Sequence, residues 1–184
     1  MNEGKSMNTA AKQRINTKDL VITALFVALS FAGSYIKIFG TIAFDSLPGF
    51  LAALLFGPVY GAAIGFLGHL FTALTSGFPL SVPLHLVIAV SMAITMLGFG
   101  HMYRLLKDRV KPAINLVITG ITGVALNGPV SLSMSIGTMA LMAGREAALG
   151  LLVLLPVLVF ASAANVAISI VLFKSLGGLW EKIR

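Results

Sequence analysis

Long apolar stretches, separated by short polar or glycine-rich breaks, dominate the hydrophobic pattern of this chain. A helix that crosses a bilayer needs roughly 20 apolar residues. The pattern predicts six hydrophobic segments, at about 20–38, 46–56, 59–75, 84–106, 113–142 and 148–176. The second is too short to cross a full bilayer, so we expect it to tilt or to pack inside the bundle, where neighbouring helices cover its ends. The chain is therefore predicted to be an all-α integral membrane protein, a six-helix bundle with a short second helix.

Three breaks in this pattern carry local structural signals. Pro48 suits the first turn of a helix, and Gly57-Pro58 suits a stop followed at once by a restart. The fifth segment is long enough to contain an irregular piece, and Asn127-Gly128-Pro129 is the predicted place for it. The second and third segments are therefore expected to fold back on each other at residues 57–58.

Composition supports the membrane assignment. The chain is 58% hydrophobic and 10% charged, whereas soluble domains carry about 25% charged residues. The net charge of +7 does not indicate a nucleic-acid partner, because the basic residues lie between hydrophobic segments. We interpret 1–18 as a basic cytoplasmic tail and 19–184 as one transmembrane domain. The absence of cysteine excludes disulfides and thiolate metal sites.

The distribution of basic residues predicts the orientation. Cytoplasmic loops carry an excess of Lys and Arg, which places both termini inside, at the cytoplasmic membrane. This orientation leaves two basic residues, Lys37 and Arg145, outside, and predicts external loops at 40–45, 76–83 and 144–146. The eleven basic residues placed inside are Lys5, Lys12, Arg14, Lys18, Arg104, Lys107, Arg109, Lys111, Lys174, Lys182 and Arg184.

Several polar side chains fall within the apolar spans, where they are expensive and by default suggest function. His69 and Thr72 lie three residues apart and share one helix face, which the orientation places in the outer half of the bilayer. His85 opens the next helix at the same level, and Met92 lies seven residues further on. A lone histidine is equally well explained by a bond to a neighbouring carbonyl, and methionine most often packs.

Other candidates come from different segments. Asn127 and Ser131 share a face of the fifth segment, Phe78 lies in an external loop, and Asp45 opens the second segment. Asn127 alternatively bonds backbone freed by the adjacent proline, and Asp45 alternatively stabilises a helix N-terminus. Residues from four segments nevertheless fall near one depth, which independent packing residues need not do. The sequence therefore predicts a ligand site near the outer face.

Two further features suit helix packing. Ala24, Ala28 and Ala32 recur every four residues along the first segment, and such small-residue stripes let helices approach closely in lipid. They serve either packing within the bundle or docking onto another membrane subunit. Asn165 lies deeper, on the sixth segment, and we assign it to an interhelical hydrogen bond.

Alternative functions find less support in the sequence. Two histidines suit zinc or nickel, but no cysteine and no third histidine at their level completes a metal site, so none is predicted. A membrane enzyme is disfavoured, because no nucleophile–base pair has a recognisable spacing. A self-sufficient, proton-coupled secondary transporter normally buries a carboxylate mid-helix, although His69 is itself titratable. All acids here fall at segment ends: Glu3, Asp19, Asp45, Asp108, Glu146 and Glu181.

The chain resembles the substrate-binding S component of energy-coupling factor (ECF) vitamin transporters. The resemblance rests on Asp45-Ser46-Leu47-Pro48, on Phe56-Gly57-Pro58 with Gly61 and Gly65, and on Ala24-x-x-x-Ala28. It implies a subunit without cofactor that binds a vitamin or vitamin precursor from outside. It also implies that Ala24, Ala28 and Ala32 dock onto a transmembrane coupling subunit, which carries two cytoplasmic ATPases.

One stretch of the resemblance bears on the ligand. Many members carry an acid where this chain has Gly68-His69, and residues 68–81 with His85 look like the subgroup for α-ribazole, a cobalamin precursor. Phe78, Met92 and Phe44 would then enclose its benzimidazole. Asp45, His69, His85 and Asn127 would bond its hydroxyls, with Thr72 and Ser131 nearby. Hydroxymethylpyrimidine, pantothenate and cobalamin are the alternative ligands.

Overall fold

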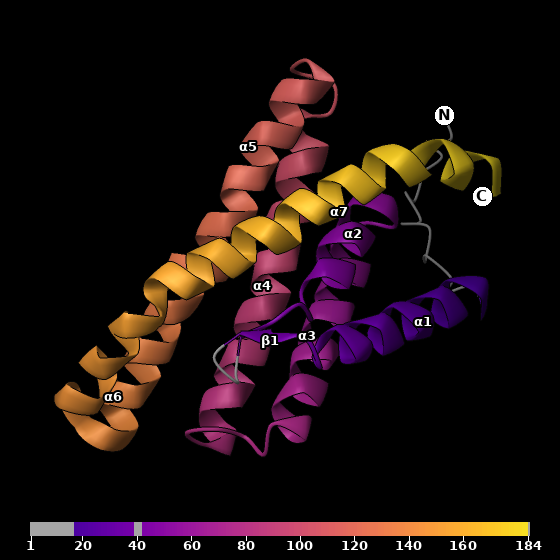
Figure 1. Cartoon of the computed structure of the whole chain (residues 1–184). Coiled ribbons are helices and arrows are strands. Elements are labelled where there is room, and N and C mark those ends of the chain that lie inside the picture. The colour runs from indigo at the N-terminus through magenta and orange to yellow at the C-terminus, as the bar shows by residue number, and fades with distance from the viewer. Residues whose placement is uncertain (1–16, 39–41, 184) are drawn as a thin grey trace, which may run out of the picture.

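The chain is built almost entirely of helices, and the computed structural model describes residues 17–38 and 42–183 (Figure 1). The first part comprises α1 (Thr17–Gly33), the antiparallel strands β1 (Lys37–Ile38) and β2 (Ile42–Ala43), α2 (Leu47–Leu55), α3 (Pro58–Thr75) and α4 (Val82–Leu106). The second part comprises α5 (Pro112–Ala125), the π-helix η1 (Leu126–Val130), α6 (Ser131–Gly150), the 3-10 helix η2 (Leu151–Leu154) and α7 (Leu155–Ile183). Most of the predicted tail at 1–18 lies outside the described residues.

Three helical stretches of the described chain are long and apolar enough to cross a membrane: Pro58–Thr75, Val82–Leu106 and Pro112–Gly178. The last is continuous by hydrogen bonding but contains one non-helical residue, Gly144, with φ 86°, within the predicted loop at 144–146. The helical membrane class of the protein is thus confirmed. The count of six segments and the cytoplasmic placement of the termini stay predictions.

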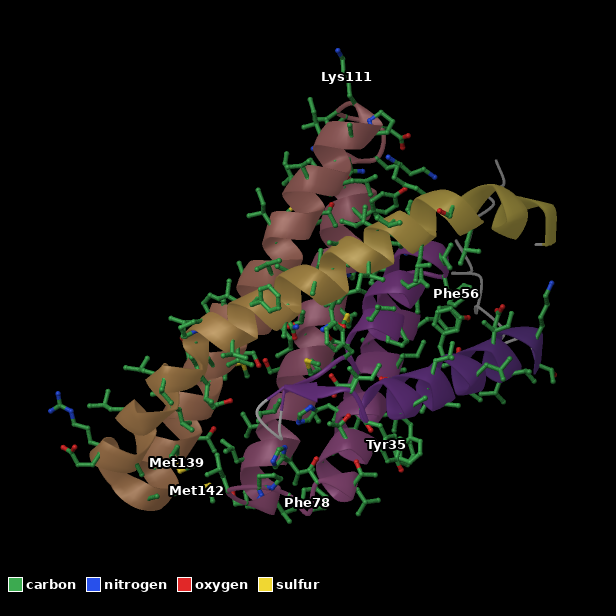
Figure 2. The ribbon with its side chains drawn as sticks, in the orientation of Figure 1. Tyr35, Phe56, Phe78, Lys111, Met139 and Met142 are labelled. Atoms are coloured by element: carbon green, nitrogen blue, oxygen red, sulfur yellow. The ribbon has the colours of Figure 1, made fainter. Side chains whose placement is uncertain are left out.

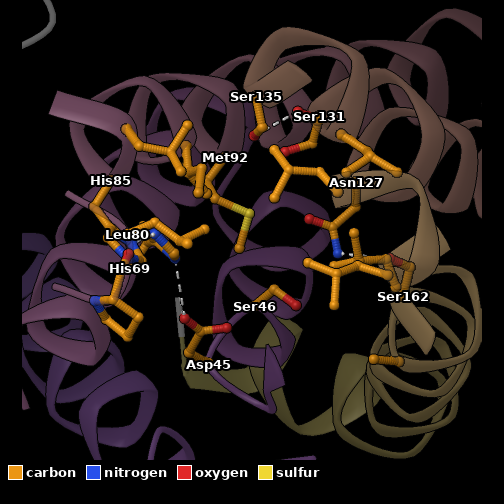
Figure 3. A pocket seen from close by; sticks show the side chains of 18 of the residues that line it. Asp45, Ser46, His69, Leu80, His85, Met92, Asn127, Ser131, Ser135 and Ser162 are labelled. Carbon is orange, nitrogen blue, oxygen red and sulfur yellow. Dashed lines mark hydrogen bonds and ion pairs between the residues drawn. The ribbon is translucent and has the colours of Figure 1, made fainter. Parts of the chain in front are cut away.

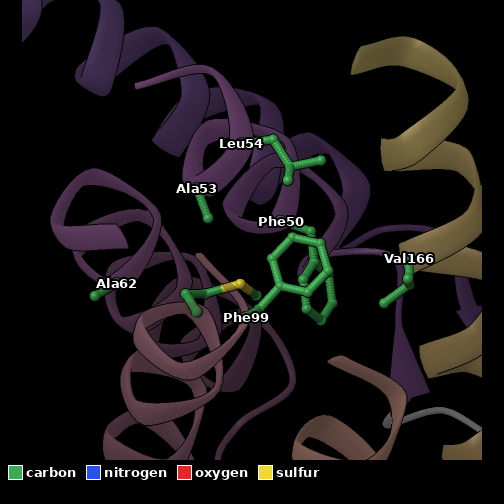
Figure 4. Close-up of a cluster of buried hydrophobic side chains, with 7 residues drawn as sticks. Phe50, Ala53, Leu54, Ala62, Phe99 and Val166 are labelled. Carbon is green, nitrogen blue, oxygen red and sulfur yellow. The ribbon is translucent and has the colours of Figure 1, made fainter. Parts of the chain in front are cut away.

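The short second helix, α2, is buried inside the bundle. All residues of α2 from Pro48 to Leu55 are buried. Phe50 at its centre meets Phe99 of α4 edge to face, with ring centroids 4.8 Å apart. Figure 4 shows these rings beside Val166 of α7, so α2 forms the centre of the bundle. The prediction that neighbouring helices would cover this segment is confirmed.

The predicted end of the first segment is wrong. Its apolar pattern continues to residue 38, but α1 ends at Gly33 and Lys37 lies in β1. The chain turns back here, so that a Cβ at position 33 would stand 2.5 Å from the Phe44 carbonyl oxygen. Only glycine permits this approach, and apolar composition alone does not separate a helix end from a following strand.

The predicted irregular piece in the fifth segment is confirmed. The π-helix η1 contains Asn127, Gly128 and Pro129. Proline lacks the N–H that the α-helical ladder requires, and a π-type turn accommodates the interruption without ending the helix. Asn127 therefore sits where the helix is locally widened.

The two ends of the bundle differ in composition. The α3–α4 loop with Phe78 and the reversal between α6 and α7 lie at one end, while the α4–α5 connection with Lys111 lies at the other (Figures 1 and 2). Arg104, Lys107 and Arg109 join Lys111 as exposed basic residues near that connection. This separation is the one expected if the α4–α5 connection faces the cytoplasm.

Close packing of α2 on α3 yields a stability prediction. A Cβ at Gly61 would lie 2.6 Å from Ala53 Cβ and 2.8 Å from the Gly49 carbonyl oxygen. Overpacking of this kind costs about 1–3 kcal/mol, so we expect Gly61→Ala to lower the free energy of unfolding by that amount in detergent. Gly137→Ala is the matched control, because nothing lies within 4 Å of its Cβ position on α6. Equal stability of the two variants would contradict the close contact.

Candidate ligand-binding site

A cavity of about 440 Å³ opens between the start of α2, the helices α3 and α4, the η1–α6 region and the η2–α7 region. Its wall is mostly apolar, with polar side chains gathered on two sides (Figure 3). No Lys or Arg is among the described residues that line it. The lining residues are Asp45, Ser46, His69, Pro79, Leu80, Leu84, His85, Ile88, Met92, Asn127, Ser131, Leu132, Ser135, Gly150, Leu151, Val153, Leu154, Leu158, Ala161, Ser162 and Asn165.

One side of the cavity holds a chain of polar contacts. His85 Nε2 lies 2.8 Å from the Pro79 carbonyl oxygen, and His85 Nδ1 lies 3.1 Å from His69 Nε2. His69 Nδ1 in turn lies 3.5 Å from Asp45 Oδ2, which also accepts a 2.7 Å hydrogen bond from the Thr72 hydroxyl. The chain thus joins the α3–α4 loop to the residue that precedes α2.

The Pro79 carbonyl oxygen, at one end of this chain of contacts, sets the direction of the hydrogen bonds that follow it. A carbonyl oxygen only accepts, so His85 Nε2 carries a proton; a neutral His85 then accepts at Nδ1 from His69 Nε2. His69 Nδ1 then faces Asp45 Oδ2 at 3.5 Å, and these two groups form an ion pair when His69 is protonated.

The same aspartate is tied to α1. The Ser30 hydroxyl donates to the Asp45 carbonyl oxygen, and Ser30 is fully buried. Asp45 itself is only 5% exposed. Because buried polar groups persist only when bonded, the contacts with Ser30, Thr72 and His69 account for the burial of this acid.

The opposite side of the cavity is built by η1, α6 and α7. Asn127 Nδ2 lies 3.0 Å from Ser162 Oγ, and Figure 3 shows the Asn127 oxygen turned toward the cavity. Ser131 and Ser135 lie one helical turn apart on α6, and the Ser135 hydroxyl donates to the Ser131 carbonyl at 3.0 Å. A flat apolar ligand with polar groups at both edges matches this arrangement.

The structure brings together most of the residues that the sequence singled out. Six of the eight predicted ligand contacts line the cavity: Asp45, His69, His85, Met92, Asn127 and Ser131. The other two lie behind the wall. Thr72 bonds Asp45, and the Phe78 ring meets His85 edge-on at 5.9 Å. Phe44, expected to enclose a ring, instead lines a separate apolar groove with Phe26 and Leu51.

Several lining residues were not expected from the sequence. Ser46 belongs to the Asp45-Ser46-Leu47-Pro48 motif but is not a predicted ligand contact. Pro79 contributes its carbonyl oxygen, which accepts from His85 Nε2. Ser162 and Asn165 stand three residues apart on α7, a spacing that places both on one face. That spacing was the available signal, but an apolar stretch with two small polar residues also suits helix packing. The prediction of an interhelical hydrogen bond for Asn165 is wrong, because its Nδ2 donates to the Ala161 carbonyl oxygen of its own helix.

Outside the cavity, Ala24, Ala28 and Ala32 are exposed on α1. The inner face of this helix bears Ser30 and Phe26, whose ring lies 5.1 Å from that of Phe56. The alanine stripe therefore does not serve contacts with the described remainder of the chain. The Lys37 side chain lies outside what the structure describes.

An apolar helical bundle with a partly polar cavity is the architecture expected of a membrane protein that binds a small molecule. The profile of the family described as "ECF transporter, substrate-specific component" matches residues 18–177. The chain therefore belongs to this family, whose members are transport subunits that bind small molecules and work with a membrane coupling subunit and ATPases. No curated protein and no solved structure matches the chain.

Proposed function

We propose that this protein captures a vitamin or vitamin precursor, best matched by α-ribazole, for import by an ECF complex. The observation that carries the proposal is the cavity of about 440 Å³, which lies within the range of about 300–1,000 Å³ typical of small-molecule sites. Its predicted position at the outer end of the bundle suits capture from outside.

The electrostatics of the cavity favour a neutral ligand. No lysine or arginine is among the described lining residues, and the one acid among them, Asp45, lies 3.5 Å from His69. An anion such as pantothenate would lose its hydration without gaining a cation, which is costly. Cobalamin far exceeds a cavity of about 440 Å³ in size.

α-Ribazole satisfies both requirements. Its dimethylbenzimidazole is flat and apolar, which suits the wall formed by Leu84, Ile88 and Met92 on α4. Its ribose carries hydroxyls that can donate to Asp45 and to the Asn127 oxygen. Hydroxymethylpyrimidine, a smaller neutral ring with an amino donor, fits the same chemistry and is the main alternative ligand.

A thermal-shift screen of the purified protein tests this proposal. We expect α-ribazole at a thousandfold excess over its dissociation constant to stabilise the fold by about 4 kcal/mol, a rise in Tm of about 10 °C for a chain of this size. Thiamine precursors, pantothenate and cobalamin serve as comparison ligands. A larger shift with hydroxymethylpyrimidine would move the assignment to that ligand, and no shift with any compound would overturn the proposed function.

The coupling step is proposed to use the alanine stripe of α1. Ala24, Ala28 and Ala32 are exposed and lie about one helical turn apart, so they form a stripe along one face of α1. Small side chains permit close approach of a partner helix in the membrane. The family works with a membrane coupling subunit, and this stripe is the surface that we assign to it.

One observation favours a second candidate, a self-sufficient proton-coupled carrier. Asp45, although at a segment end, is buried and lies 3.5 Å from the titratable ring of His69, and buried acids and histidines of this kind form intramembrane proton relays. Uptake of radiolabelled ligand by cells that lack the ECF coupling subunit separates the two functions. An S component supports no sustained uptake there, whereas a secondary transporter continues to import.

A further inference from the structure

The side chain of Asn165 on α7 has one polar atom without a partner. Asn165 is 1% exposed, and its Nδ2 donates to the Ala161 carbonyl oxygen at 2.9 Å. Its Oδ1 is buried with no hydrogen-bond partner, a condition that it shares, among the described residues, only with Ser34 Oγ. Asn165 lines the cavity, whereas Ser34 does not.

The orientation of this amide is fixed by its neighbour. The Ala161 carbonyl oxygen only accepts hydrogen bonds, so the amide nitrogen must face it. Rotating the amide by 180° would set two acceptors against each other. The unpaired atom is therefore the oxygen.

The hydroxyls nearest in sequence on α7 do not reach this oxygen. Ser162 Oγ accepts a hydrogen bond from Asn127 Nδ2, and the Ser169 hydroxyl donates to the Val166 carbonyl oxygen at 2.8 Å. A buried acceptor without a donor costs free energy comparable to a lost hydrogen bond. Native proteins retain few such groups, and each calls for a reason.

We propose that Asn165 is a specificity-determining contact whose Oδ1 accepts a hydrogen bond from an N–H or O–H group of the ligand. This inference rests on the proposed function and narrows its ligand class. Asn165 lies one turn deeper along α7 than Ser162, so the ligand carries its donor on the part that enters furthest. A hydroxyl of a sugar or an amino group on a ring meets this requirement; a carbonyl or carboxylate in that place does not.

A binding cycle tests this assignment. Dissociation constants are measured by calorimetry for α-ribazole and for analogues in which one ribose hydroxyl at a time is replaced by hydrogen. We expect the wild type to lose at least about tenfold in affinity for one of these analogues, the effect of leaving one buried acceptor unpaired. Asn165→Leu should bind α-ribazole at least about tenfold more weakly than the wild type does. It should bind the analogue as tightly as it binds α-ribazole, so that discrimination between the two ligands is lost.

Three further variants make the cycle decisive. Asn165→Asp should retain discrimination between α-ribazole and the analogue, because a carboxyl buried here is neutral, donates its O–H to the Ala161 carbonyl oxygen and keeps one acceptor oxygen. Asn165→Ala replaces the leucine variant if the latter does not fold. Ser169→Ala is the matched control, because Ser169 is buried on the same helix but does not line the cavity. Its affinities should equal those of the wild type.

The outcomes separate this inference from the proposed function. Full discrimination by Asn165→Leu or Asn165→Ala overturns the role of Asn165 and leaves α-ribazole binding intact. Failure of α-ribazole to bind the wild type overturns that ligand, and the cycle is then run with the vitamin that gives the largest thermal shift and its analogue lacking an N–H or O–H. A wild type that binds no compound overturns both.

Discussion

Replacing Ala28 by tryptophan is expected to abolish ligand uptake by cells while leaving ligand binding to the purified protein unchanged. Ala28 is exposed at the centre of the stripe on α1, and the cavity lies on the other side of α2 and α3, whose residues α1 contacts. An indole at this position holds a partner helix away, since close approach in lipid depends on small side chains. Uptake of radiolabelled ligand and calorimetry measure the two quantities.

The matched control is Ala140→Trp. Ala140 is also an exposed alanine on an apolar helix, α6, and it does not line the cavity. We expect this variant to take up and bind ligand as the wild type does. Equal loss of uptake and binding in Ala28→Trp would indicate misfolding or a site effect, and normal uptake would remove the stripe from the docking surface.

The sequence predicted the bundle best where local backbone chemistry sets a boundary. Pro48 and Gly57-Pro58 place the short helix at 46–56, and α2 runs from Leu47 to Leu55. The Asn127-Gly128-Pro129 break likewise coincides with η1. These features depend on residues adjacent in the chain, so no knowledge of the tertiary fold is needed.

Contacts between distant segments could be predicted only in part. Orientation placed Asp45, His69 and His85 at one level, but the bond from His69 to His85 depends on how closely α3 and α4 pack. The α7 wall escaped prediction for the same reason. Apart from Asn165 its residues are small or apolar, and only the packing of α7 across α2 and η1 directs Asn165 to the cavity.

The positions of Thr72 and Phe78 illustrate a further limit. Helix periodicity places Thr72 on the face of His69, but Thr72 reaches the site through Asp45. Phe78 adopts a positive φ of 50° in the loop and lies against His85. A sequence pattern identifies the face or loop of a residue but not which side chain stands between it and the ligand.

Substitutions of Asp45 should separate its structural role from its role in binding. Asp45→Leu removes every polar contact of the carboxylate and leaves His69 Nδ1 facing an apolar group. Breaking a buried pair in this way costs about 3–5 kcal/mol. We therefore expect this variant to unfold at a lower temperature. It also loses the carboxylate hydrogen bond to the ligand, worth about 1.5–3 kcal/mol, so its ligand affinity should fall by about a hundredfold, at 1.4 kcal/mol for each tenfold.

Asp45→Asn is expected to fold normally, for a geometric reason. An amide nitrogen in the place of Oδ2 carries two hydrogens, one for His69 Nδ1 and one for Thr72 Oγ1. The Thr72 hydroxyl then donates to the Gly68 carbonyl oxygen, which lies 3.0 Å away. Every hydrogen bond along the chain to His85 is then satisfied, so the Tm should stay within a few degrees of the wild type.

Ligand affinity of Asp45→Asn should nevertheless fall by about tenfold. Figure 3 shows the second Asp45 oxygen turned toward the cavity. A carboxylate paired with a protonated His69 accepts a hydrogen bond about twice as strong as one to a neutral amide. Asp108→Leu and Asp108→Asn, at an exposed acid beyond α4, are the controls and should bind as the wild type. Thermal unfolding and calorimetry on the same preparations decide the case. If Asp45→Asn unfolds as readily as Asp45→Leu, a carboxylate is required for the fold. If both bind ligand with full affinity, Asp45 is not a ligand contact, and the acid serves only to hold His69 and the start of α2 in place.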